Sequence, residues 1–115
     1  RLARRLCNDC AISTEDIPKK SLLDFGFNEE LLFSANIRTA VGCNNCNDGY
    51  KGRVGVFEVL RISPEISKLI MESANSIDIY NQASKEGFYD LRQSALVKAA
   101  QGLISLEEVN RITIE

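Results

Sequence analysis

The sequence predicts a small α+β protein with two subdomains, one over residues 1–60 and one over residues 61–115. Three observations lead to this class. Two Cys-x-x-Cys pairs lie in a loop-rich first half, a β-branched segment bounded by glycines follows the second pair, and apolar residues recur at helical spacing in the second half. We therefore expect a small β-hairpin subdomain with short helices, followed by a compact bundle of about four α-helices.

Two short helices are predicted between the cysteine pairs. Residues 11–18 are polar and end in a proline, which is typical of a loop. The segment KKSLLDFGF predicts a helix that ends at Gly26, because glycine adopts the left-handed conformation of a helix C-cap at little cost. Asn28 is a favoured N-cap residue, and the two glutamates after it suit the first turn of a second helix.

Two strands are predicted on either side of the second cysteine pair. Residues 37–41 predict a brief strand, and the segment RVGVFEVLRI, residues 53–62, predicts a longer one. Gly49 and Gly52 give the chain between them a tight path. We therefore expect these two strands to pair with each other as a hairpin.

Four helices are predicted in the second half. Their predicted starts are Ser63, Ser76, Asp90 and Ser105, and glycines 87 and 102 end the second and third. Pro64 suits the first position of the first of these helices. The sequence SLEE, from Ser105 to Glu108, is a capping box in which each side chain satisfies a backbone N–H group of the other residue.

The composition excludes several functions. The formal net charge is −2 and the chain has no histidine, so general nucleic-acid binding and catalysis by Ser-His or Cys-His pairs are not expected. We expect no direct membrane insertion, because no apolar run approaches the roughly 20 residues that span a bilayer. The chain begins without methionine and without an export signal, so we interpret it as part of a longer cytoplasmic protein.

The four cysteines carry the strongest functional signal. Cys7 and Cys10 form one pair, Cys43 and Cys46 form the other, and 32 residues separate the pairs. Two Cys-x-x-Cys turns that face each other supply the tetrahedral thiolate set of a structural zinc site. Because such a site has no open position for water, we expect a structural Zn²⁺ and no catalytic residues in this chain.

Other roles for the four thiols stay open at this point. Iron accepts the same ligand set. A pair of disulfides would require an oxidising compartment, which a chain without an export signal does not favour. Redox chemistry would need only one reactive Cys-x-x-Cys pair, which normally lies on a thioredoxin-like βαβ frame.

Basic residues surround the cysteine pairs in the sequence. Four thiolates and one divalent cation carry a net charge of about −2, which nearby cations would offset. The candidates are Arg4, Arg5, Lys51 and Arg53. Each of them is equally compatible with an ordinary solvated side chain.

The segment GYKGRVG and the aromatic residues each have two interpretations. The segment is glycine-rich and basic, but it lacks the G-x-x-x-x-G-K-[ST] order of a phosphate-binding loop, so a structural turn is the better interpretation. Glu58 is expected on a solvent-facing side of a strand. Tyr50, Phe57, Phe88 and Tyr89 are expected in core or hinge packing. A free-standing zinc-ribbon-like module that binds nucleic acid or protein remains the alternative function.

The motifs together resemble the C-terminal region of the secretion ATPases of bacterial type II secretion and type IV pilus assembly. That family combines C-x-x-C with C-x-x-C-x-x-G-Y-x-G-R-x-G-[apolar]-x-E and ends with G-x-x-S-x-x-E-V. The matching residues here are Cys7, Cys10, Cys43, Cys46, Gly49, Tyr50, Gly52, Arg53, Gly55, Val56, Glu58, Gly102, Ser105, Glu108 and Val109. The segments GYKGRVGVFEV and EEVNRIT resemble the pilus-extension member of this family more closely.

The resemblance implies that the parent protein is a hexameric cytoplasmic ATPase at the inner-membrane face. Its ATP and Mg²⁺ sites, with their Walker motifs and histidine box, would precede this region, so this chain on its own is expected not to be an enzyme. The implied partners are the motor core, the neighbouring subunits of the hexamer and an inner-membrane platform protein, with no nucleic acid. In that setting the zinc-binding subdomain would couple ATP hydrolysis to pilin or pseudopilin assembly.

Overall fold

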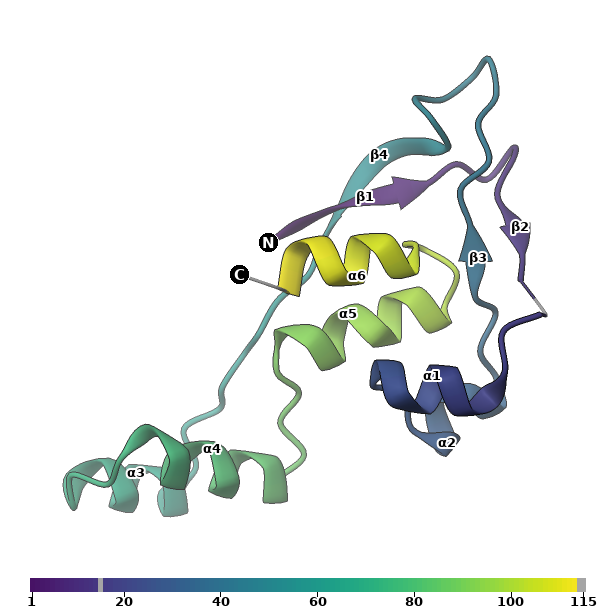
Figure 1. Ribbon diagram of the computed structural model, residues 1–115. Helices are drawn as coiled ribbons and strands as arrows, with labels where there is room; N and C mark the ends of the chain where they lie inside the picture. The colour runs from purple at the N-terminus through teal and green to yellow at the C-terminus, as the bar shows by residue number, and fades with distance from the viewer. Residues whose placement is uncertain (15, 114–115) are drawn as a thin grey trace. The chain divides into compact units, whose positions relative to one another are not determined.

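The computed structural model describes residues 1–14 and 16–113, and it confirms the α+β class. In order along the chain, its elements are β1 (Leu2–Leu6), β2 (Ile12–Ser13), α1 (Lys19–Phe25), α2 (Glu29–Phe33), β3 (Arg38–Thr39), β4 (Tyr50–Gly55), α3 (Pro64–Met71), α4 (Ser76–Lys85), α5 (Leu91–Ala100) and α6 (Leu106–Thr113) (Figure 1). The two predicted helices between the cysteine pairs and the four after residue 62 are all present.

The chain divides into two compact units. Unit 1 comprises Arg1–Phe57 and Leu91–Glu115, and unit 2 comprises Glu58–Asp90. This grouping differs from the predicted division at residue 60, because α5 and α6 belong to the same unit as the cysteine-bearing segments. Of the four predicted C-terminal helices, each unit therefore holds one pair.

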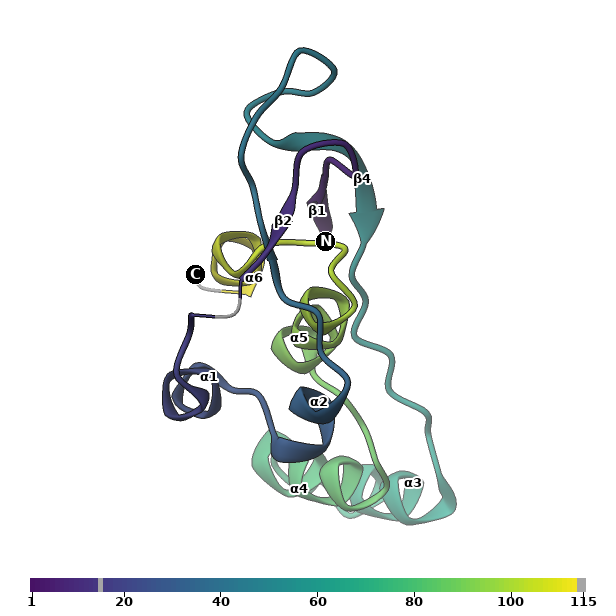
Figure 2. The ribbon, with the colours of Figure 1, turned by 90° about the vertical axis from the view of Figure 1, so that its right-hand side faces the viewer.

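The strands of unit 1 form two antiparallel ladders. Strand β1 pairs with β4, and β2 pairs with β3. The predicted hairpin between residues 37–41 and 53–62 is therefore wrong, because the N-terminal strand takes the place beside β4. The predicted loop over residues 11–18 also contains the two residues of β2. Figure 2 shows both ladders leading to the loop that precedes β4.

The predicted strand over residues 53–62 ends early. Strand β4 stops at Gly55, and the chain from residue 56 to 62 has no regular secondary structure. The ladder itself ends with a pair of hydrogen bonds between Arg1 and Val56: the Arg1 backbone nitrogen donates to the Val56 carbonyl at 2.7 Å, and the Val56 N–H donates to the Arg1 carbonyl at 2.8 Å. The Val56 side chain is buried in the core.

The core of unit 1 lies between the β1–β4 ladder and the two last helices. Its buried residues are Ala3, Phe27, Ile37, Val56, Ala95, Leu96, Ala99, Ala100, Ile104, Val109 and Ile112. Three of the four core residues of α5 are alanines, which lets neighbouring backbone approach closely. At Gly102, where φ is +78°, an added Cβ would lie 2.8 Å from Arg38 Cδ and 3.0 Å from the Asn36 carbonyl. Glycine is therefore required at the predicted end of α5.

The helix caps follow the predicted residues with one correction. Asn28 Oδ1 accepts a hydrogen bond from the Leu31 N–H at 2.6 Å, and Ser63 Oγ accepts one from the Ile66 N–H at 3.1 Å. In α4 the N-cap is Asn75 rather than Ser76, and its Oδ1 accepts from the Asp78 N–H at 2.9 Å. Asparagine and serine are both favoured N-cap residues, and in α4 the cap is Asn75, one position before Ser76.

Unit 2 is a helical hairpin preceded by an extended segment. Among its described apolar side chains only Ile66 and Ala83 are buried. Tyr80 packs edge-on against Phe88 with ring centres 6.3 Å apart, and its hydroxyl donates to Asp90 at 3.1 Å. In the described part of the chain, no helix is both long and apolar enough to cross a lipid bilayer.

Candidate metal centre

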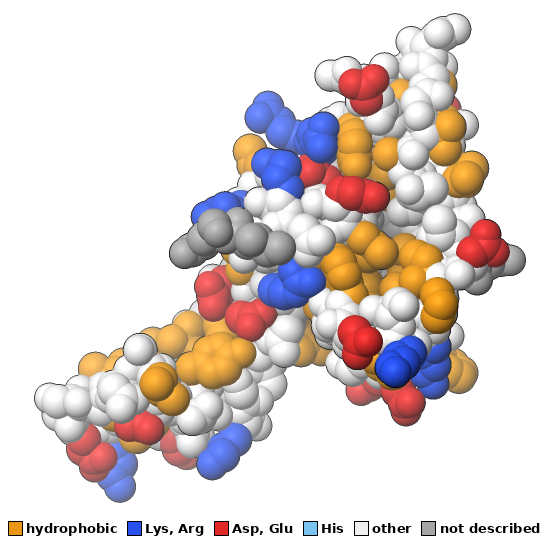
Figure 3. All heavy atoms as spheres, in the orientation of Figure 1, with side chains coloured by type: hydrophobic (Ala, Val, Ile, Leu, Met, Phe, Trp, Pro, Cys, Tyr) orange, Lys and Arg blue, Asp and Glu red, His pale blue; other side chains and the backbone are white. Residues whose placement is uncertain are grey.

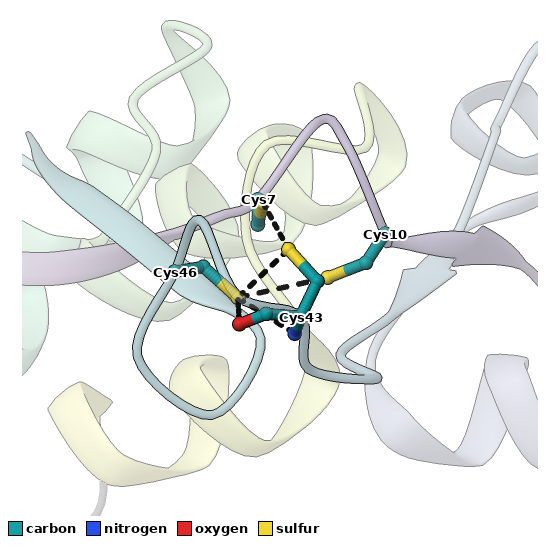
Figure 4. A group of neighbouring side chains, drawn as sticks. All are labelled: Cys7, Cys10, Cys43 and Cys46. Atoms are coloured by element: carbon teal, nitrogen blue, oxygen red, sulfur yellow. Dashed lines mark hydrogen bonds between the residues drawn. The ribbon is translucent and has the colours of Figure 1, made fainter.

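The two ladders place the four cysteines at one end of unit 1. Cys7 follows β1 and Cys10 precedes β2, whereas Cys43 follows β3 and Cys46 precedes β4. Because β1 pairs with β4 and β2 with β3, the Cys7–Cys10 turn must lie against the Cys43–Cys46 turn. Figure 4 shows the four side chains pointing toward one another from these two turns.

The distances between the sulfur atoms match a four-thiolate site. All four Sγ atoms lie within 4.8 Å of one another. The Sγ–Sγ distances are 3.8 Å between Cys7 and Cys43, 3.7 Å between Cys10 and Cys46, and 3.6 Å between Cys43 and Cys46. A tetrahedron with Zn–S bonds of about 2.3 Å has edges of about 3.8 Å. The donor set therefore fits a closed tetrahedral site.

The same distances differ from those of disulfide bonds. An S–S bond is about 2.05 Å long, and all four cysteines here are free thiols. The sulfur contacts run both within the second turn, at 3.6 Å from Cys43 to Cys46, and between the turns, at 3.7–3.8 Å, and all are far longer than an S–S bond. The arrangement therefore favours a shared ion over oxidation of each pair.

Backbone amides point at two of the sulfur atoms. The Gly42 N–H donates to Cys10 Sγ at 3.3 Å, and the Cys43 N–H donates to Cys46 Sγ at 3.3 Å. Hydrogen bonds to sulfur stabilise the charged thiolate form. The turns that aim these amides depend on left-handed backbone at Gly42 and Gly49, where φ is +118° and +97°.

The pKa values of the Cys43 and Cys46 thiols are shifted in opposite directions by their surroundings. Burial alone would raise the pKa of Cys46, but hydrogen bonds from the Cys43 backbone, the Cys43 thiol and the Gly49 backbone lower it to about 7. At Cys43 the Asn45 backbone amide lowers the pKa, but the neighbouring Cys46 and burial raise it to about 12. Within this turn, Cys46 therefore ionises before Cys43, and the hydrogen bond between them keeps the proton on Cys43.

A buried carboxylate links the first strand to the last helix. Glu108 is fully buried and accepts hydrogen bonds from the Arg4 backbone N–H at 2.6 Å and the Arg4 guanidinium at 3.2 Å. The Arg111 guanidinium donates to the same carboxylate at 2.6 and 2.9 Å. Burial would raise the pKa of Glu108, but these arginines lower it to about 2.

This cluster corrects two predictions. Ser105 Oγ does accept from the Glu108 N–H, at 3.3 Å, but the Glu108 side chain binds Arg4 and Arg111, so the predicted capping box is only half formed. Arg4 was a candidate to offset charge at the cysteines, and it instead pairs with Glu108. No local pattern predicts this pairing, because the partners are 104 positions apart.

Tyr50 connects the cysteine loop to α6. The Arg4 guanidinium lies over the Tyr50 ring, 4.1 Å from its centre, and the Tyr50 hydroxyl lies 2.7 Å from Ser105 Oγ. Tyr50 begins β4, four positions after Cys46. The residue that follows the second cysteine turn is thereby bonded to the residue that caps the last helix.

Arg38 makes a second connection that the sequence did not predict. Its Nη1 donates to Asn8 Oδ1 at 3.2 Å, inside the first cysteine turn, and to the Gly102 carbonyl at 3.3 Å, after α5. Its side chain thus joins the Cys7–Cys10 turn to the α5–α6 connection. Nothing in the local sequence around residue 38 distinguishes this arginine from a solvated one.

The remaining predicted residues occupy varied positions. The GYKGRVG segment forms strand β4 and acts as structure rather than as an open loop. Lys51, Arg53 and Arg5 are exposed on the strands, and Glu58 is exposed as predicted but lies beyond the end of β4 rather than in a strand. Phe57 and Tyr89 are largely exposed, so their predicted packing role is wrong for the described residues, whereas Tyr50 and Phe88 are half-buried.

Comparison with known proteins identifies the family. The chain matches the family described as "Type II/IV secretion system protein" over residues 1–111, and it belongs to this family. It is 50% identical over 113 residues to the type IV pilus assembly ATPase PilB of Pseudomonas aeruginosa, covering 98% of this chain and 20% of the relative. It is 49% identical over 117 residues to the protein of the same name from Acinetobacter baylyi, covering 100% of this chain and 20% of the relative.

A type II secretion relative is less similar than these two pilus relatives. The type II secretion system ATPase E of Vibrio cholerae is 35% identical over 119 residues, covering 100% of this chain and 22% of the relative. The chain thus spans about a fifth of the length of the curated relatives it matches.

Proposed function

We propose that this chain is a zinc-stabilised, non-catalytic C-terminal domain of a hexameric ATPase for type IV pilus assembly. In the parent protein it couples ATP hydrolysis in the motor core to the assembly of pilin at the cytoplasmic face of the inner membrane. The observation that carries the proposal is the identity of 50% with a type IV pilus assembly ATPase along nearly the whole chain. The type II secretion ATPase of Vibrio cholerae is 35% identical, and this lower value supports the pilus system over the type II secretion system.

The geometry of the cysteines supports the metal part of the proposal. Cys7, Cys10, Cys43 and Cys46 would hold Zn²⁺, which supplies four bonds that fix the two turns to each other. With no ligand position left for water, the site would have a mechanical role. The sulfur spacing and the amides at Cys10 and Cys46 suit such a closed site.

The surrounding contacts suggest how the domain transmits movement. Arg38 bonds the Cys7–Cys10 turn to the α5–α6 connection, and Tyr50, four positions after Cys46, bonds the start of β4 to Ser105. Displacement of one turn would therefore move α6 rather than bend a loop. We infer that unit 1 moves as a stiff body when the ATPase changes nucleotide state.

The test uses the full-length parent with Cys43→Ser and Cys46→Ser together. We expect loss of about one zinc per subunit and a severe loss of surface pili, because half of the thiolate set is removed. Metal content, hexamer mass, ATPase rate and pilus number are measured side by side. Asn44→Ser is the matched control, since Asn44 is exposed in the same turn.

The outcome is informative in both directions. Loss of pili with a preserved ATPase rate would place the defect in coupling. A zinc-free variant with unchanged hexamer, ATPase rate and pilus number would refute the proposed role.

A further inference from the structure

The outer face of the β1–β4 ladder is both apolar and basic. Leu2 lies opposite Gly55, and Arg4 lies opposite Arg53, so these alternate pairs project from the same face. The Phe57 ring lies over Gly55, 2.6 Å from where a Cβ would be, and so covers the position beside Leu2. We call Leu2, Arg4, Arg53 and Phe57 the ribbon face.

Much of this face is exposed in unit 1, where Arg4 is the member that pairs with Glu108 and lies over Tyr50. Leu2 is 55% exposed and Phe57 is 70% exposed. Two arginines directly opposite each other on a ladder repel, and Glu108 neutralises only Arg4 among them. Arg5 and Lys51 are also exposed on these two strands, which contain no acidic residue. A ladder that binds no other surface has no need of exposed apolar side chains beside unneutralised cations.

The opposite combination occurs in unit 2. The turn between α3 and α4 exposes Ile70, Met71 and Ile77 together with Glu72 and Asp78, which we call the hairpin tip. Met71 is 84% exposed and Ile77 is 68% exposed. Residues 58–90 carry six acidic and three basic side chains, so this unit is acidic overall. In unit 1, by contrast, basic side chains gather over the β1–β4 strands (Figure 3).

We propose that the hairpin tip of one copy of this chain docks on the ribbon face of a second copy. Apolar side chains on both surfaces would be buried, and Glu72 and Asp78 would face Arg53 and its neighbours. Charge complementarity favours this occupant, because the same sequence carries an apolar basic face and an apolar acidic one. Two different surfaces meet in such a contact, which is the heterologous type that closes into rings. The inference rests on the proposed function in an oligomeric ATPase.

The experiment measures self-association of the zinc-loaded 115-residue chain by sedimentation velocity. We expect concentration-dependent association at about 50 mM salt that weakens at about 500 mM salt, because screening shortens the range of the charges. Arg53→Glu and the pair Glu72→Lys, Asp78→Lys are each expected to weaken association by tenfold or more, on the order expected for lost interfacial charge pairs. Phe57→Ala is expected to weaken it at both salt concentrations.

Mixing the variants identifies which surfaces meet. Arg53→Glu keeps its hairpin tip, and the Glu72→Lys, Asp78→Lys variant keeps its ribbon face. An equimolar mixture should therefore associate, because the intact tip of one variant meets the intact ribbon face of the other and the two reversed surfaces are also complementary, while each variant alone stays monomeric. A chain carrying all three changes should associate again. Lys20→Glu and Glu30→Lys, which are exposed changes outside both surfaces, should behave as the wild type.

Three results would overturn the proposal. They are a monomeric wild type at low salt, variants that associate like the wild type, and a mixture that does not associate. Salt-dependent binding of a single-stranded oligonucleotide by a monomeric wild type, lost in Arg53→Glu, would assign the ribbon face to nucleic acid instead. Because every cysteine is intact in these variants, failure here is distinguishable from failure of the metal-dependent function.

Discussion

At the scale of single residues, Glu108 is the side chain with the most demanding surroundings. It is the one charged residue that is fully buried within the described part of the chain, and two half-exposed arginines share it. Removing one member of such a cluster leaves the other charges without their partner. The stability of unit 1 should therefore depend strongly on this carboxylate.

We expect Glu108→Gln to lower the free energy of unfolding by about 2–3 kcal/mol, because the amide keeps the shape but loses the charge. Urea unfolding at neutral pH measures this loss. Glu107→Gln is the matched control, since Glu107 lies in the same first turn but is not fully buried. Equal stability of the two variants would contradict the assigned role of Glu108.

The same residue predicts a pH dependence. The pKa of Glu108 is lowered from 4.5 to about 2 in the folded chain, so the unfolded chain binds the proton more readily. This contribution to stability is fully present above about pH 5 and is lost as the pH falls toward 2, by an amount on the order of 3 kcal/mol. Unfolding measured from pH 6 to pH 2 should show a shallower decline in Glu108→Gln than in the wild type. Parallel declines would show that other carboxylates are responsible.

At the scale of elements, the connection from β4 to α6 depends on one hydrogen bond. The hydroxyl groups of Tyr50 and Ser105 lie 2.7 Å apart, and Ser105 also caps α6. We expect a double-mutant cycle of Tyr50→Phe and Ser105→Ala to give a coupling energy on the order of 1 kcal/mol. Tyr80→Phe is the control for loss of a hydroxyl elsewhere. Strict additivity of the two changes would show that the contact has no energetic weight.

Local signals predicted the helices and the cysteine turns but not the strand pairing. Gly26, Asn28 and Ser63 act within a few positions of themselves, so their roles can be read from the sequence. The partner of β4 lies more than 40 positions away and is joined to it by no tight turn, so periodicity could not reveal it. The hairpin predicted from neighbouring segments was wrong for this reason.

The candidate site was predictable for a different reason. Cysteine is rare and its spacing is specific, so the four ligand candidates follow from the sequence alone. Their supporting residues do not. Arginine is common on surfaces, and only the folded chain shows that Arg38 donates to Asn8 or that Arg4 lies over Tyr50.

At the scale of the whole molecule, the division into units determines what metal removal should affect. Strand β1 binds α6 through Glu108, and the Leu6 N–H donates to the Leu103 carbonyl at 2.8 Å. Loss of zinc should therefore loosen α5 and α6 together with the cysteine turns. The helices α3 and α4 belong to unit 2, which contains none of the four cysteines.

We expect hydrogen exchange after chelation to show lost protection in β1, β4 and α6, with little change in α3 and α4. Mass spectrometry of peptides from each element measures this difference. Addition of zinc should restore the original pattern. Protection that falls equally in both units, or in neither, would contradict the proposed metal dependence of unit 1.

The bonds between the first strand and the last helix have a consequence for how the protein is made. All four thiols have left the ribosome once residue 46 has emerged, yet Arg4 finds Glu108 only after the final helix has been synthesised. Binding of the proposed ion and closure of the fold are therefore separable in time. The nascent chain would have the opportunity to bind that ion well before α6 packs against β1.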